Sequence, residues 1–122
     1  MKTPTESMAK SGAIEVHRPL PLMTGYVRLV RPGDRGRRGS FCAGLRAQAT
    51  IYGFWLDRCF VEDFWSRPCT TAFEDLIEHI QHDHIAHVIV PCLTHFSVYP
   101  DFQASAVDLL GLLGVRLWAV ES

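Results

Sequence analysis

The chain has 122 residues, of which 48% are hydrophobic and 20% charged, with a formal net charge of -1. These values are typical of one globular domain with its own core and exclude a collagen-like or disordered chain. No apolar run of about 18 residues is present, so we expect no membrane-spanning helix, and the N-terminus lacks the apolar centre of a secretory signal.

The first part of the chain predicts a tail, a strand and a helix. Residues 1–23 are polar and then proline-containing, with no sustained period, and predict a flexible N-terminal tail ahead of a domain over 24–122. Residues 25–30 are rich in β-forming side chains, and the Gly-, Pro- and Arg-rich segment 31–39 predicts a loop. The next stripe has helical spacing and ends at Gly53; its members are Phe41, Leu45, Gln48, Ala49 and Tyr52.

The rest of the chain predicts three more strands and two helices. Strands are expected over 54–61, 85–91 and 115–120, and the continuous apolar run at 85–91 predicts a central strand. Thr71 and Glu74 form a capping box at the start of one helix, and Pro100 begins the other. The core stripes are Phe73, Leu76, Ile77 and Ile80 in the first helix and Phe102, Ala106, Leu109, Leu110 and Leu113 in the second.

Strands and helices therefore alternate along the chain. With right-handed crossovers, this order predicts an α/β fold of three layers: a mostly parallel four-stranded sheet with helices on both faces. In such a fold the ligand crevice lies beyond the carboxyl ends of the strands, where the strand order reverses. The segments expected there are 30–38, 62–68 and 91–98, together with Glu121.

The charges are distributed unevenly. Residues 28–46 contain six arginines and one aspartate, whereas residues 57–83 contain two arginines and seven acidic residues. Such asymmetry either focuses an electric field on one surface or forms two solvated faces that neutralise each other on folding. The sequence leaves both interpretations open.

Arg28 is the charged residue whose position is most informative. It lies inside a predicted strand between Val27 and Leu29, where an unpaired guanidinium is costly. It can hold an anion such as phosphate, with Arg67 as a second contact, or it can form a structural ion pair with Glu62 or Asp63.

The cysteines and histidines give weaker signals. The four cysteines, at 42, 59, 69 and 92, form neither a CxxC pair nor a dense disulfide framework, so we expect reduced thiols and a cytoplasmic protein. His79 and His82 lie on a predicted helix, and Cys92 and His95 follow it, but the spacing matches no recognised zinc motif. A solvated polar helix face explains the two helical histidines, and we predict no metal and no cofactor.

The order of several short motifs between Gly25 and Glu121 resembles the N-terminal catalytic domain of serine recombinases, the resolvase/invertase family. Tyr26-Val27-Arg28-Leu29 resembles the family's opening Tyr-x-Arg-x-Ser strand, and Leu45-Arg46-Ala47-Gln48 is similar to its Leu-x-x-Gln helix. The remaining matches are Val61-Glu62-Asp63 with Arg67-Pro68, the strand Val88-Ile89-Val90 leading to Leu93, and Leu113-Gly114-Val115. The resemblance implies a resolvase-like α/β domain.

The departures from the family's pattern concern catalysis. The position of the serine that attacks the scissile phosphate is Val30, and the aspartate and arginine of the second signature fall on Thr94 and His95, with a later arginine at Val98. Fixed charges stabilise the anionic phosphorus in such reactions, and these side chains do not supply them. The resemblance therefore implies a catalytically inactive domain. The family's dimerisation helix and DNA-binding domain have no counterpart in these residues, so the oligomeric state stays open.

Two functions follow from these residues, and a third is weaker. The first is a non-cleaving domain that binds DNA, another phosphate-bearing ligand or a protein. Its predicted contacts are Arg28, Gln48 and Arg67, with the basic loop Arg31, Arg35, Arg37 and Arg38. The alternative is an active strand-exchange or other phosphate-handling enzyme that uses a displaced serine, for which Ser40, Ser66 and Ser97 are candidates. The third is a protein–protein module with Trp55, Trp65 and Trp118 partly exposed.

Overall fold

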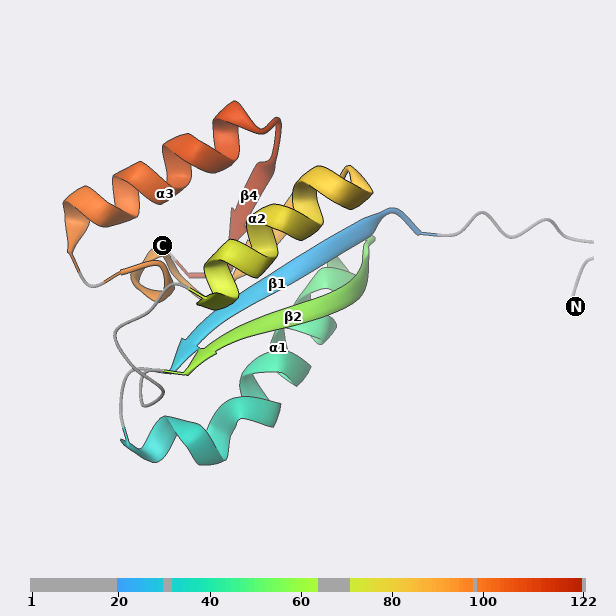
Figure 1. Cartoon of the computed structure of the whole chain (residues 1–122). Helices are drawn as coiled ribbons and strands as arrows, with labels where there is room; N and C mark the ends of the chain where they lie inside the picture. Colours follow the sequence, from blue (N-terminus) through green and yellow to red (C-terminus); the bar gives the residue numbers. More distant parts are fainter. Residues whose placement is uncertain (1–19, 30–31, 64–70, 98, 122) are drawn as a thin grey trace, which may run out of the picture.

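The computed structural model of the chain describes residues 20–29, 32–63, 71–97 and 99–121 (Figure 1). Strands and helices alternate along it. The strands are β1 (Leu22–Leu29), β2 (Trp55–Asp63), β3 (His87–Val90) and β4 (Arg116–Ala119). The helices are α1 (Arg38–Ile51), α2 (Thr71–Asp83) and α3 (Pro100–Leu112), with short 3-10 helices η1 (Pro32–Arg37) and η2 (Leu93–His95).

The strands form a four-stranded sheet in the order β2-β1-β3-β4, and each described pairing is parallel. The predicted α/β fold is therefore confirmed, including the inner position of the apolar strand at 85–91, since β3 lies between β1 and β4. Val88, Ile89 and Val90 are fully buried, as a strand covered on both faces requires. No helix within the described residues is long and apolar enough to cross a membrane.

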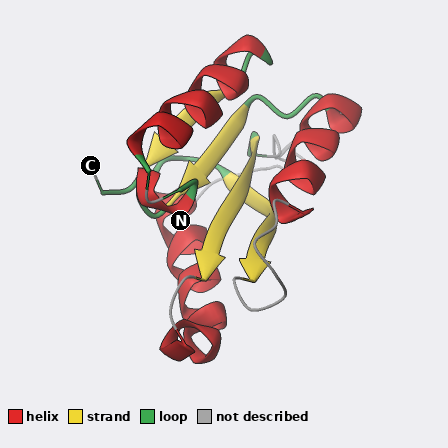
Figure 2. Cartoon of the chain, turned by 60° about the vertical axis from the view of Figure 1, so that its left-hand side comes forward, coloured by secondary structure: helices red, strands yellow, loops and turns green. Residues whose placement is uncertain are grey.

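Helices cover both faces of the sheet, and each face has its own apolar core (Figure 2). Successive residues of β1 point to opposite faces, so Tyr26 belongs to the core under α2 and α3 while Val27 belongs to the core under α1. In α1 the buried residues are Leu45 and Ala49, as the helical stripe predicted. Gly53 has φ 90, the left-handed conformation expected where the helix ends.

Two boundaries differ from the sequence prediction. β1 begins at Leu22, inside the predicted tail, because Leu22 pairs with Trp55 of β2 and the N–H of Trp55 donates to the carbonyl of Pro21 at 2.9 Å. The segment 31–39 was predicted as a loop, but its described part forms η1 and the start of α1. Local helical hydrogen bonding thus overrides three glycines and a proline there.

Helix α3 presents a different face to the core than its sequence predicted. Phe102 and Leu109, both expected in the core, are 64% and 38% exposed, whereas Leu110 is buried. Because apolar residues occur on several sides of this helix, its pattern defines no unique core stripe. Packing of Leu110, Ala106 and Leu113 against the sheet determines its orientation.

Candidate functional site

The strand order reverses between β1 and β3, so the crevice of this fold lies at the carboxyl ends of these two strands. Arg28 is the penultimate residue of β1, and η2, which ends at His95, follows β3. The topology therefore brings the two residues to the same edge of the sheet. This edge is the predicted site.

Arg28 is half-buried and held by three hydrogen bonds. Its Nε–H donates to the carbonyl oxygen of His95 at 3.2 Å, and an Nη2–H donates to the hydroxyl of Tyr26 at 3.3 Å. Its backbone N–H donates to Nδ1 of His95 at 3.0 Å. Nη1 has no hydrogen-bond partner within the described part of the chain. Among the described residues, the guanidinium is therefore held in place by neutral groups.

Glu62 stands next to this arginine but is joined to it indirectly. Glu62 is 2% exposed, and its Oε1 accepts hydrogen bonds from the hydroxyl of Tyr26 at 3.4 Å and from the N–H of Phe73 at 3.2 Å. Phe73 lies in the first turn of α2, so the carboxylate caps this helix. In place of the direct ion pair with Glu62 considered from the sequence, the described residues form a hydrogen-bonded relay from Arg28 through Tyr26 to Glu62. Burial raises the pKa of the Tyr26 hydroxyl, and the phenol stays protonated.

His95 occupies the position at which the family resemblance implies an arginine. Burial lowers the pKa of His95, and the positive charge of Arg28 lowers it further, while Asp34 and Glu121 act in the opposite direction. Because Nδ1 accepts the backbone N–H of Arg28, any proton of the neutral ring lies on Nε2. The imidazole therefore positions the main chain of β1 and adds no fixed positive charge.

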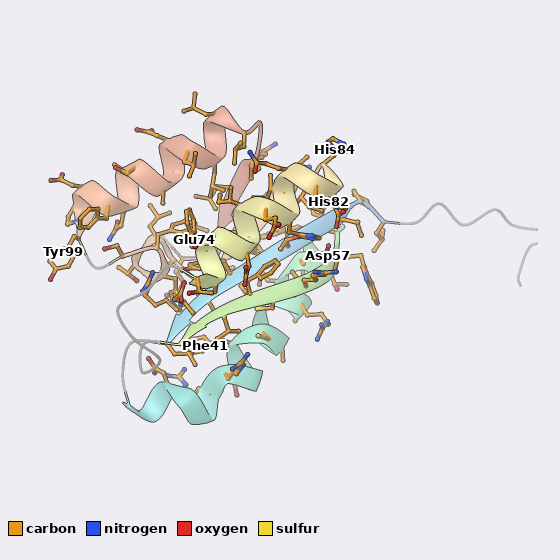
Figure 3. All side chains as sticks on the ribbon, viewed as in Figure 1. Phe41, Asp57, Glu74, His82, His84 and Tyr99 are labelled. Atoms are coloured by element: carbon orange, nitrogen blue, oxygen red, sulfur yellow. The ribbon has the colours of Figure 1, made fainter. Side chains whose placement is uncertain are left out.

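The basic segment, residues 28–46, contacts His95 through the ring of Phe41. The Arg37 guanidinium carbon lies 4.9 Å from the centre of the Phe41 ring, and this ring meets the His95 ring edge-on at 5.5 Å. Figure 3 shows Phe41 beside the ends of β1 and β2. A continuous series of contacts thus runs from Arg37 through Phe41 and His95 to Arg28. We call these four residues with Tyr26 and Glu62 the carboxyl-edge cluster.

The uneven charge distribution has a clear place in the fold. Arg37, at the start of α1, and Arg38 and Arg46, within it, are exposed, and the helix contains no acidic residue. The acidic residues of α2, on the opposite face of the sheet, are Glu74, Asp75, Glu78 and Asp83. The two charged segments therefore face solvent on opposite sides, and the α1 side presents a basic surface.

The structure does not bring every predicted contact to the edge. Gln48 lies in α1 ten residues after Arg38, about 15 Å along the helix, and so it is away from the strand ends. Thr94 is exposed, and its hydroxyl lies 2.8 Å from Sγ of Cys92. The hydroxyl of Ser97 accepts the N–H of Tyr99 at 3.1 Å, which gives this serine a turn role.

Several predicted residues lie outside the described part of the chain. These are Val30, Arg31, Trp65, Ser66, Arg67 and Val98, and the side chains of Arg35 and Asp63. The described tryptophans differ in exposure: Trp55 is 58% exposed, whereas Trp118 packs against Tyr52 and Phe54.

A polar network at the opposite end of the sheet was missed by sequence reasoning. His79 was assigned to a solvated face, but it is buried between Asp57 and Asp83, each 2.9 Å from one ring nitrogen. The second carboxylate oxygen of Asp57 accepts the hydroxyl of Thr24 at 2.7 Å. An aspartate within the apolar strand β2 was the available signal, since a buried carboxylate needs such partners.

His82, in contrast, is exposed as predicted, and Figure 3 shows it at this same end of the molecule. Its pKa is raised by the hydrogen bond to Asp83, whose own pKa is lowered. Across the described ranges, no group of three or more His, Cys, Asp or Glu side chains is arranged so that it could hold a metal ion.

No family model matches the chain, and no curated protein sequence matches it. Solved structures do. One is the C-terminal catalytic domain of ISC1926 TnpA, an IS607-like serine recombinase, with a TM-score of 0.70 and 12% identity over 83% of this chain and 68% of that chain. Another is the N-terminal catalytic domain of TP901-1 integrase, with a TM-score of 0.67 and 14% identity over 81% of this chain and 76% of that chain. The chain therefore has the fold of serine recombinase catalytic domains, and the resemblance seen in the sequence is confirmed at the level of the fold.

Proposed function

We propose that this domain binds DNA, or another phosphate-bearing ligand, at the carboxyl-edge cluster and the adjoining start of α1, without cleaving it. The observation that carries the proposal is the arrangement of the arginines. Arg28 is held at the strand ends by neutral groups, and Arg37 and Arg38 extend the positive charge along an exposed helix without an acidic residue. Guanidinium groups bind phosphate oxygens in a bidentate manner.

Two of the acidic residues near this charge are buried, and Glu121, which acts on His95, is exposed. Asp34 and Glu62 are buried, so their carboxylates act within the protein, whereas the arginines of α1 are exposed. A phosphate backbone approaching from solvent therefore meets guanidinium groups first. The half-buried Phe41 ring among them is a further contact surface for a nucleotide.

The absence of cleavage rests on the residues at the positions that the family uses for catalysis. Val30 has no nucleophilic oxygen, and Thr94 and His95 supply no fixed charge for an anionic phosphorus. The lowered pKa of His95 supports this argument, because the imidazole stays neutral at physiological pH.

A binding assay with matched variants tests the proposal. Fluorescence anisotropy with a labelled duplex, measured between about 50 and 200 mM salt, should give an association constant that falls linearly on a double-logarithmic plot. Replacing both Arg37 and Arg38 by alanine should weaken binding and reduce the slope by about 0.9 for each phosphate that the variant no longer neutralises. The control, Arg58→Ala with Arg116→Ala, removes the same charge from exposed positions outside the cluster and should bind like the parent.

Three results would overturn the proposal. One is no association at low salt with either duplex or single-stranded DNA or with a nucleotide. Another is an equal loss of binding in the control variant, which would mean that net charge alone is responsible. The last is a covalent adduct with a nicked DNA substrate that disappears in Ser40→Ala or Ser97→Ala, since this would establish the alternative, an enzyme with a displaced serine.

A further inference from the structure

Two cysteine side chains from different elements meet on the α1 side of the sheet. Cys42 lies in the second turn of α1, and Cys59 lies in β2, 17 residues further along the chain. The S–H of Cys42 points at Cys59, and the two sulfur atoms are 2.9 Å apart. Both thiols are free and half-buried, so neither is sealed in the core. The pair takes no part in the carboxyl-edge cluster.

The fold holds both sulfurs in place. Cys59 pairs with Gly25 of β1, and a Cβ on Gly25 would lie 3.4 Å from the Cys59 sulfur, so the missing side chain leaves room for the thiol. Leu45, one turn after Cys42, is buried and anchors this part of α1 against the sheet. To form a disulfide bond of about 2.05 Å, the two sulfurs would have to approach by about 0.9 Å.

The surroundings of the pair attract an anionic oxidant. Arg38 and Arg46 lie four residues before and four residues after Cys42, on the same side of α1, and both are exposed. Burial raises the pKa of the Cys59 thiol, while Arg46 and Arg38 act in the opposite direction. Low-molecular-mass disulfides such as oxidised glutathione carry carboxylates that two flanking guanidinium groups favour. Cys42, on the helix between these arginines, is the sulfur that such a reagent meets first.

We propose that Cys42 and Cys59 are a redox-active thiol pair that closes a reversible disulfide between α1 and β2. The Cys42 thiolate attacks the small-molecule disulfide, a protein–thiol mixed disulfide forms, and one thiolate leaves. The sulfur of Cys59 then attacks the Cys42 sulfur as its proton passes to the departing group, and the second small thiol is expelled. The protons of the two cysteines end on the two released thiols, so the protein loses two electrons and the small disulfide gains them. This proposal does not rest on the proposed DNA binding.

Oxidation of the full chain in glutathione redox buffers, with mass spectrometric mapping, tests the proposal. Trypsin cuts after Arg38, Arg46 and Arg58, and cleavage after Glu62 separates Cys59 from Cys69 and Cys92. The expected product joins residues 39–46 to residues 59–62, is 2 Da lighter than the two peptides together, and returns to free thiols with excess reduced glutathione. The melting temperature should rise by about 5–10 °C on oxidation because the bond closes a loop in the unfolded chain.

Cysteine variants provide the controls. Cys42→Ser and Cys59→Ser should each abolish the linked peptide and the thermal shift, and Cys92→Ser should retain both. If the linked peptide is absent at every ratio of oxidised to reduced glutathione, the proposal is wrong. It is equally wrong if Cys42 joins Cys69 or Cys92 as often as it joins Cys59. Neither result would bear on the DNA-binding proposal, because the arginine variants that test it leave both cysteines in place.

Discussion

Tyr26→Phe removes a single oxygen from the centre of the carboxyl-edge cluster. The Tyr26 side chain is fully buried, and its hydroxyl accepts from Arg28 at 3.3 Å and donates to Glu62 at 3.4 Å. The ring contacts with Phe73 and Phe96, at centroid separations of 5.7 and 5.5 Å, remain in the variant. The loss is therefore confined to the two hydrogen bonds.

The expected loss of stability in Tyr26→Phe follows from the two hydrogen-bond partners of the hydroxyl, Arg28 and Glu62. Both hydrogen bonds involve charged groups, which favours a large effect, but both distances are long, which reduces it. Glu62, at 2% exposure, has little access to water that could replace the phenol. We expect destabilisation of about 2 kcal/mol, or roughly a 30-fold change in the folding equilibrium.

Urea unfolding followed by circular dichroism measures this value. The denaturation midpoint should fall while the dependence on urea concentration stays constant, because the buried surface is unchanged. Tyr99→Phe is the matched control, since Tyr99 is 62% exposed and its substitution should change stability by less than about 0.5 kcal/mol. If Tyr26→Phe is as stable as Tyr99→Phe, the relay from Arg28 to Glu62 does not stabilise the fold, and the account of the cluster is wrong.

Two further predictions concern packing and pH. Gly25→Ala should cost about 1–3 kcal/mol in urea unfolding, because its Cβ would lie 3.1 Å from Leu45 Cδ1, whereas Gly33→Ala, which faces open space, should cost little. The pKa of His95 is lowered in the folded state from its usual value of 6.5, so the unfolded chain binds the proton more readily. The contribution of His95 to the free energy of unfolding is therefore fully present above about pH 6.5 and should decrease as the pH falls below that value. His95→Asn should flatten this pH dependence. An unchanged profile in His95→Asn would contradict the assignment.

The sequence predicted the layers of this fold because its patterns are local. The continuous apolar run ending in Val88, Ile89 and Val90 requires cover on both faces, and the alternation of strands with helices leaves few topologies for a parallel sheet. Arg28 was identified for the same reason, since a guanidinium within a strand must have partners. The position of the site at the carboxyl edge followed from topology alone.

Partners distant in the sequence could not be predicted in the same way. The carbonyl of His95, 67 residues from Arg28, is a backbone group that every residue has, so no pattern marks it as the acceptor. The cap of α2 illustrates the same limit: Thr71 and Glu74 predicted a local capping box, whereas in the structure the N–H of Phe73 donates to Glu62 from β2. Tertiary contacts of this kind replace local solutions when a buried carboxylate needs a donor.

Phosphate binding and phosphodiester cleavage place different demands on the same edge of the sheet. Binding needs a positive charge that remains available to a ligand, and a direct ion pair with Glu62 would largely cancel the charge of Arg28. The structure instead places the Tyr26 hydroxyl between them and uses the His95 carbonyl as the second acceptor. Such neutral acceptors orient a guanidinium while leaving its net charge in place. The groups that stabilise this corner of the fold therefore also keep Arg28 suited to an anionic ligand, and this property needs no nucleophile at the end of β1.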